Sequence, residues 1–145
     1  VATRGKVDPR LPAEAPVLGV RVNGQCMAFS LVDLPAREVL QDKVGGVSVV
    51  VFVQDVARAA TAFRAVKGDV RLDFAVDVIA PVTAPFRDKN TGTRWSIAGR
   101  GIDGLLRGEE LVWVDSVKCK WFAWVAEHPD TALHVAPPPP EEAKK

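Results

Sequence analysis

Residues 17–30 read VLGVRVNGQCMAFS, which is two mostly apolar segments joined by Asn23-Gly24. Asn-Gly accepts the positive φ angles of a two-residue type I′ turn, so this stretch predicts a β-hairpin. Pairing across the turn places three apolar or long side chains on each strand opposite one another: Val22 with Gln25, Val20 with Met27, and Leu18 with Phe29. Arg21 and Cys26 then lie on the other face of the hairpin.

The segments that follow also favour strands. Val47–Val53 is a β-branched run interrupted only by Ser48, which is typical of a strand buried on both faces, and we place it at the centre of the sheet. Ala36–Asp42 is compatible with either a short helix or an extended edge, ended by Gly45-Gly46. Ala59–Ala65 and Val70–Val76 flank Lys67-Gly68-Asp69 and predict a second hairpin with one solvated face.

Turn residues and one helical pattern organise the second half of the chain. Pro81 and Pro85 confine their stretch to an edge or a loop, because proline cannot donate to a ladder. Asp88–Gly92 predicts a turn leading into a strand at 93–97, and Leu111–Val114 predicts another short strand. A helical spacing runs through Lys118–Glu127, where apolar and aromatic residues recur at i, i+3, i+4 and i+7: Trp121, Trp124, Val125 and His128.

These elements predict a mainly β fold: a single-domain antiparallel β sandwich, or a partly open barrel of hairpins, with one short C-terminal helix. At 145 residues the chain has the length of one domain. We divide it into an N-terminal extension at 1–16, a β domain at 17–136, and a Pro-rich charged tail at 137–145. The tail, Pro137, Pro138, Pro139 and Pro140 followed by EEAKK, favours polyproline II structure and has no apolar surface to bury.

Composition excludes several functional classes. The formal net charge is +1, from 19 Lys and Arg against 18 Asp and Glu, and neither sign clusters in a block, so we expect no nucleic-acid partner. No apolar run approaches the roughly 20 residues that a membrane-spanning helix needs, so we expect no transmembrane segment. Gly99–Gly104 matches G-x-G-x-x-G, but a further glycine follows where a dinucleotide site needs a helix, so we interpret it as a turn.

Candidate catalytic or metal-ligating residues are few. No serine sits in a G-x-S-x-G elbow, and the paired carboxylates Glu109-Glu110 and Glu141-Glu142 fall in turn or tail contexts, so we predict neither an enzyme nor a bound cofactor. The chain offers four soft or borderline ligands, at scattered positions that predict no metal site by themselves: Cys26, Cys119, His128 and His134.

Each of these four residues also has a structural interpretation that involves no metal. The two cysteines can stay as unpaired thiols or, in an exported protein, form a disulfide. His128 ends the predicted helix, where an imidazole can bond the terminal carbonyls, whereas we expect a surface role for His134.

The four tryptophans are best explained by packing of the helix on the sheet, which accounts for three of them and leaves one ring for an exposed pocket. An exposed ring could also stack on a sugar.

Five segments in a fixed order carry a resemblance: VNGQ-x-x-AF at 22–29, VGGV-x-VVV at 44–51, DKNTGTRW at 88–95, GLLRGEEL at 104–111, and WFAWVAEHPDT at 121–131. The chain resembles the bacterial domain-of-unknown-function family 3179 over about Val17–Val135, and the last segment is the most specific. Many members look exported or lipid-anchored, which implies an extracytoplasmic location. Many also carry Tyr-Cys-Pro-x-Cys-Gly after the central strand, where this chain reads FVQDVAR at 52–58 without a cysteine. We therefore expect this chain to lack the chemistry of that thiol pair.

The first functional hypothesis is a non-catalytic accessory or structural subunit of a larger protein assembly. We expect it to bind protein subunits through its β domain and its extended termini, with Pro137–Pro140 lying along a partner's surface. A membrane-associated complex, for example an electron-transfer complex, is the kind of partner that we expect. The alternative, from another class, is a small extracytoplasmic metal- or ligand-binding protein that uses Cys26, Cys119, His128 or His134.

Overall fold

The computed structural model describes residues 8–54, 59–77 and 79–134. Within these ranges short strands precede and follow one helix. In chain order the elements are β1 (Pro16–Val22), β2 (Gln25–Ser30), β3 (Arg37–Val44), β4 (Val47–Gln54), β5 (Ala59–Arg64), β6 (Val66–Lys67), β7 (Val70–Arg71), β8 (Phe74–Val76), β9 (Phe86–Asp88), β10 (Arg94–Trp95), β11 (Gly101–Asp103), β12 (Ser116–Lys120), α1 (Trp121–Glu127) and β13 (Ala132–His134).

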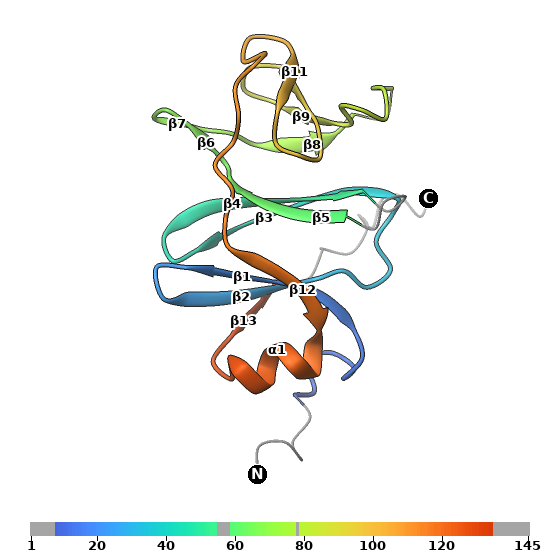
Figure 1. Cartoon of the computed structure of the whole chain (residues 1–145), viewed down its shortest axis with the longest axis vertical. Coiled ribbons are helices and arrows are strands. Elements are labelled where there is room, and N and C mark those ends of the chain that lie inside the picture. The colour runs from blue at the N-terminus through green and yellow to red at the C-terminus, as the bar shows by residue number, and fades with distance from the viewer. Residues whose placement is uncertain (1–7, 55–58, 78, 135–145) are drawn as a thin grey trace, which may run out of the picture.

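The sheets are stacked along the long axis of the molecule, with α1 at one end (Figure 1). The sheet nearest the helix has the order β12-β1-β2-β13, the middle sheet is β3-β4-β5, and the far sheet is β11-β10-β9-β8; β6 and β7 form a separate two-stranded pair. The prediction of a mainly β fold with one short C-terminal helix is confirmed, in its sandwich form. One detail differs, because β13 runs parallel to β2 and the sheet that contains them is therefore mixed.

The hairpin β1–β2 follows the predicted register. Val20 pairs with Met27, Leu18 with Phe29, and Arg21 with Cys26. Asn23 and Gly24 adopt φ angles of 51° and 77°, the left-handed values that a two-residue turn requires. The local turn chemistry therefore determines which face of each strand meets the core.

Strand β4 is the centre of the stack, as the β-branched run predicts. Its seven residues from Ser48 to Gln54 are buried. Val49, Val51 and Val53 join the core shared with β1 and β2, whereas Val50 and Phe52 join the core shared with β8, β9 and β10. The segment at 36–42, for which both a helix and an extended edge were possible, is part of the edge strand β3.

Three predicted elements differ in the structure. The arms of the second hairpin meet only next to their turn, through the β6–β7 pair and the hydrogen bond from Leu72 N–H to Ala65 O at 2.8 Å. Farther along, β5 pairs with β4 and β8 pairs with β9. Leu111–Val114 forms no strand of its own, and only an isolated bridge joins Trp113 to Phe63. The helix begins at Trp121, since residues 118–120 complete β12, which pairs with β1.

The part of the expected N-terminal extension that the structure describes packs against α1. The backbone N–H groups of Trp121 and Phe122 donate to the carbonyl oxygens of Ala15 and Ala13, at 2.8 and 3.0 Å. Residues 8–15 thus supply acceptors for the first turn of a helix that has no side-chain cap.

Candidate functional site

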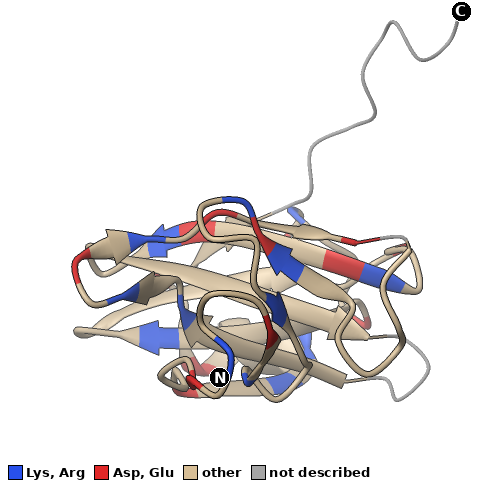
Figure 2. Cartoon of the chain, turned by 90° about the horizontal axis from the view of Figure 1, so that it is seen from above, with Lys and Arg blue, Asp and Glu red and all other residues tan. Residues whose placement is uncertain are grey.

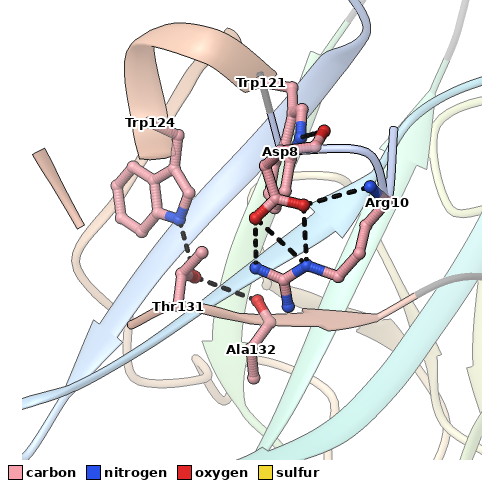
Figure 3. Close-up of polar contacts among 6 residues, drawn as sticks. All are labelled: Asp8, Arg10, Trp121, Trp124, Thr131 and Ala132. Atoms are coloured by element: carbon pink, nitrogen blue, oxygen red, sulfur yellow. Dashed lines mark hydrogen bonds and ion pairs between the residues drawn. The ribbon is translucent and has the colours of Figure 1, made fainter. Parts of the chain in front are cut away.

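The WFAWVAEHPDT segment forms the packing of α1 on the sheet (Figure 3). The indole N–H of Trp121 donates to the carbonyl oxygen of Asp8 at 3.1 Å, and the indole N–H of Trp124 donates to Thr131 Oγ1 at 2.8 Å. Trp121 and Trp124 are buried, and the Trp124 ring lies directly over Gly19 of β1. Helix packing thus accounts for two tryptophans and not for the predicted three, because Trp95 is buried in the separate core between β4 and the far sheet. Trp113 is 57% exposed.

An ion pair within the N-terminal segment lies next to the first residue of α1. Arg10 binds the Asp8 carboxylate with its guanidinium, at 2.8 Å for the closest pair, and lies 5.1 Å from the centre of the Trp121 ring. The hydrogen bond from Arg10 lowers the pKa of Asp8 below its ordinary value.

Cys26 and His128 lie together where α1 ends. The Cys26 Sγ is 3.4 Å from His128 Nδ1, and the imidazole packs 4.1 Å from the Trp124 ring, measured between ring centres. An imidazole at this position can bond the terminal carbonyls, but the His128 side chain faces the thiol. The backbone N–H of His128 donates to Trp124 O. Two of the four soft ligands therefore form a thiol–imidazole pair, both half-buried.

The other two soft ligands lie elsewhere. Cys119 pairs with Val17 of β1 and Cys26 with Arg21, which separates the cysteines by about 13 Å along β1 and by two strand spacings across it. A disulfide needs Cα atoms within about 7 Å, so these two thiols stay free. Burial, with the negative charge of Glu127, raises the pKa of the Cys119 thiol.

His134 links two sheets instead of lying free on the surface as expected. Its Nδ1 is 2.8 Å from the Asp42 carboxylate of β3, and its side chain is 14% exposed. Within the ranges that the structure describes, no three His, Cys, Asp or Glu side chains gather into a metal-binding group.

The DKNTGTRW segment is organised by the buried carboxylate of Asp88. It accepts hydrogen bonds from the Thr91 backbone N–H at 2.6 Å, the Thr91 hydroxyl at 2.9 Å and the Trp95 indole N–H at 2.8 Å. The sequence pattern predicts the turn but not this hydrogen-bond network. The signal was an aspartate three residues before a threonine, a spacing at which a side chain commonly bonds the backbone of a turn.

A second carboxylate holds the outer face of the far sheet together. Asp77 accepts a hydrogen bond from the Arg94 guanidinium at 3.0 Å, and Arg87 lies 3.7 Å away. Burial opposes ionisation of Asp77, but the hydrogen bonds from Arg94 and the Ile79 backbone, with the charges of both arginines, lower its pKa overall. Figure 2 shows acidic and basic residues interspersed over the sheets, as the balanced composition predicts.

Two cavities lie at opposite ends of the middle sheet. One of about 570 Å³ opens between β3 and the β8–β9 hairpin, and its lining includes Lys43, Lys89 and Arg71. The other, of about 160 Å³, lies at the end of β4 and is lined mostly by apolar side chains, including Val53 and Ala59. Residues 55–58, where members with the thiol pair would carry its chemistry, are outside the described residues.

Exposed apolar side chains follow the segment that descends along the stack from β11 to α1 (Figure 1). Their exposed fractions are 58% for Val112, 57% for Trp113, 52% for Val117 and 51% for Phe122. The backbone under them is held against the edge of β5, where Arg64 N–H donates to Val112 O at 2.8 Å and Val114 N–H donates to Ala62 O at 3.0 Å. The predicted partner-binding residues Pro137–Pro140 lie outside the described residues.

Comparison with known proteins gives one match. The family model described as "Protein of unknown function (DUF3179)" matches residues 2–131. No curated protein and no solved structure matches the chain. In the described ranges, no helix has the length and apolar character needed to cross a bilayer.

Proposed function

The chain belongs to the DUF3179 family of proteins of unknown function, and on that premise we propose that it is a non-catalytic accessory subunit of a larger protein assembly. The assembly that we propose is membrane-associated and extracytoplasmic, with electron-transfer complexes as one class to test. The observation that carries the proposal is the exposed Trp113 on a fixed backbone. Tryptophan is strongly buried on average, and exposed aromatic side chains are enriched at protein interfaces.

The geometry around Trp113 supports binding rather than incidental exposure. Because its segment is bonded to β5, the backbone that presents the indole loses little freedom when a partner covers it. Val112 precedes it and is similarly exposed, but consecutive side chains of an extended segment point to opposite faces, so the indole of Trp113 is the proposed apolar anchor.

The test is the native size of the untagged protein in mild-detergent extracts of its host, measured by gel filtration with immunodetection. We expect elution far above 15.6 kDa, with co-eluting membrane proteins. Trp113→Ser should shift elution toward the monomer, whereas Leu105→Ser, at an even more exposed apolar side chain that is not bonded to β5, should not. Elution of the unmodified protein as a monomer would refute the subunit proposal.

The tail beyond Val135 is proposed to lie along the same partner, because a Pro-rich segment binds with little loss of conformational freedom. Truncation after Val135 should weaken the association. Unchanged elution of the truncated chain would contradict a role of the tail in binding the partner.

A second candidate function is metal binding at Cys26 and His128. Their 3.4 Å separation is close to the about 3.5 Å expected between a thiolate and an imidazole nitrogen that share one tetrahedral zinc ion. The remaining ligands would come from water or from a partner. Cys26→Ala should abolish metal retention and Cys119→Ala should not, since Cys119 lies elsewhere on the sheet. Metal-free protein after purification without a chelator would remove this candidate.

A further inference from the structure

We propose that the cleft between β3 and the β8–β9 hairpin binds an acidic peptide segment of the partner protein; this inference rests on the proposed subunit function. The cleft has a volume of about 570 Å³ and is open to solvent. Its base includes the buried side chains of Ser48 and Phe74, and exposed charged residues surround that base.

The acidic residues of the cleft lining have charged partners, whereas two of its lysines do not. Asp42 faces His134 at 2.8 Å, and Asp73 lies 3.5 Å from Arg71, so both acidic residues already have partners. The ammonium groups of Lys43 and Lys89 have no hydrogen-bond or ion-pair partner among the described residues. The cleft therefore presents two free positive charges, and an anionic ligand would complement them.

The same arrangement favours carboxylates on an extended chain over a compact, doubly charged ion. Asp73 lines the cleft with the two lysines, and its carboxylate would repel a phosphate group that carries about two negative charges. The Asp42 carboxylate instead turns toward His134, which does not line the cleft. Single carboxylates spaced along a peptide can each approach one ammonium group and avoid the Asp73 carboxylate.

The edge of β3 supplies an extended wall for such a peptide. β3 is the outermost strand of its sheet among the described strands. The Gln41 side-chain amide forms two hydrogen bonds with the backbone of the segment that leads into β8. It donates to Leu72 O at 2.7 Å and accepts from Phe74 N–H at 3.2 Å. Beyond Gln41 the strand continues to Val44, where the Lys43 N–H already donates to Asp42 Oδ1 at 2.7 Å. We therefore expect the peptide to bind through the lysine side chains along this wall rather than by adding a strand to it.

The experiment titrates the isolated chain of residues 1–145 with a fluorescein-labelled hexaglutamate peptide at low salt, with hexaglutamine as the uncharged control. We expect saturable binding of hexaglutamate alone. Lys43→Glu or Lys89→Glu should each weaken it by about tenfold, because charge reversal replaces attraction with repulsion. Arg107→Glu is the matched control: it makes the same change in net charge at an exposed loop residue outside the cleft and should leave binding unchanged.

Three results would overturn the inference: no saturable binding of hexaglutamate, equal weakening by Arg107→Glu, or displacement of all bound peptide by inorganic phosphate at equimolar concentration. The first two would exclude a specific site, and the third would identify a phosphate site instead. Peptide binding is measured on the isolated chain, so its failure is distinct from a monomeric elution of the native protein, which would refute the subunit proposal itself.

Discussion

The effect of Gly19→Ala on the free energy of unfolding can be derived from the contact between Gly19 and the Trp124 ring. A Cβ atom at Gly19 would lie 2.3 Å from two ring carbons of Trp124 and 2.6 Å from a third, so the ring must move. Overpacking of this kind costs about 1–3 kcal/mol, and displacing the indole from Thr131 removes a buried hydrogen bond worth about 1 kcal/mol. We therefore expect Gly19→Ala to lower the free energy of unfolding by about 2–4 kcal/mol.

A double-mutant cycle isolates that contact. Trp124→Leu removes the clashing ring, at a cost of about 3 kcal/mol of its own. In that background Gly19→Ala should be neutral, or stabilising by about 0.5 kcal/mol, because alanine restricts the unfolded strand more than glycine does. Urea unfolding followed by far-UV circular dichroism measures all four proteins without depending on the fluorescence of the tryptophan that is changed. An equal cost of Gly19→Ala in both backgrounds would refute the packing argument.

Three further outcomes are expected. Asp88→Asn should lower the free energy of unfolding, measured in urea, by about 3 kcal/mol. Either orientation of the new amide turns its NH₂ group toward a donor, Thr91 N–H or Trp95 Nε1–H. A loss below about 1 kcal/mol would contradict the network. The lowered pKa of Asp77 means that its ionised form stabilises the fold above the unfolded pKa of about 3.9 and that this stabilisation is lost as pH falls through the lower folded pKa. The stability difference between wild type and Asp77→Asn should therefore shrink between pH 6 and pH 3, and a constant difference would exclude the linkage. Because burial raises the pKa of Cys119, its alkylation by iodoacetamide at pH 8 in a Cys26→Ala background should be slower than after unfolding in urea, and equal rates would contradict its burial.

The parts of the fold that could be predicted from the sequence are those encoded within a few residues. The β1–β2 register follows from Asn23-Gly24 and from the alternation on either side of it. The central position of β4 follows from its β-branched composition, and the burial of three tryptophans follows from their size. In each case the local signal and the tertiary environment agree.

The parts that could not be predicted depend on pairing between distant segments. Alternation in Ala59–Ala65 shows which side chains are buried, but it does not show that β5 pairs with β4 instead of with the following strand. Lys118–Lys120 fits the helical spacing as well as a strand, and pairing with β1 decides between them. The Cys26–His128 pair joins residues 102 positions apart, which no sequence spacing could indicate.

The family motifs and the proposed binding residues overlap only in part. Asp88 and Trp95 hold a turn, and Trp121, Trp124 and Thr131 fasten the helix to the sheet, so these motif residues are used in building the fold.

Among the proposed binding residues, Trp113 and Lys43 lie outside the segments that carry the family resemblance, and Cys26 occupies a position that its motif leaves unspecified. Lys89 and His128 lie within the motifs at 88–95 and 121–131. The motif residues Asp88, Trp95 and Trp124 therefore build the turn and the helix packing, whereas the exposed Trp113 that we propose to bind a partner is not part of a motif. Tests of binding should accordingly substitute Trp113, Lys43 and Lys89 in this protein rather than transfer an activity from a member that carries the thiol pair.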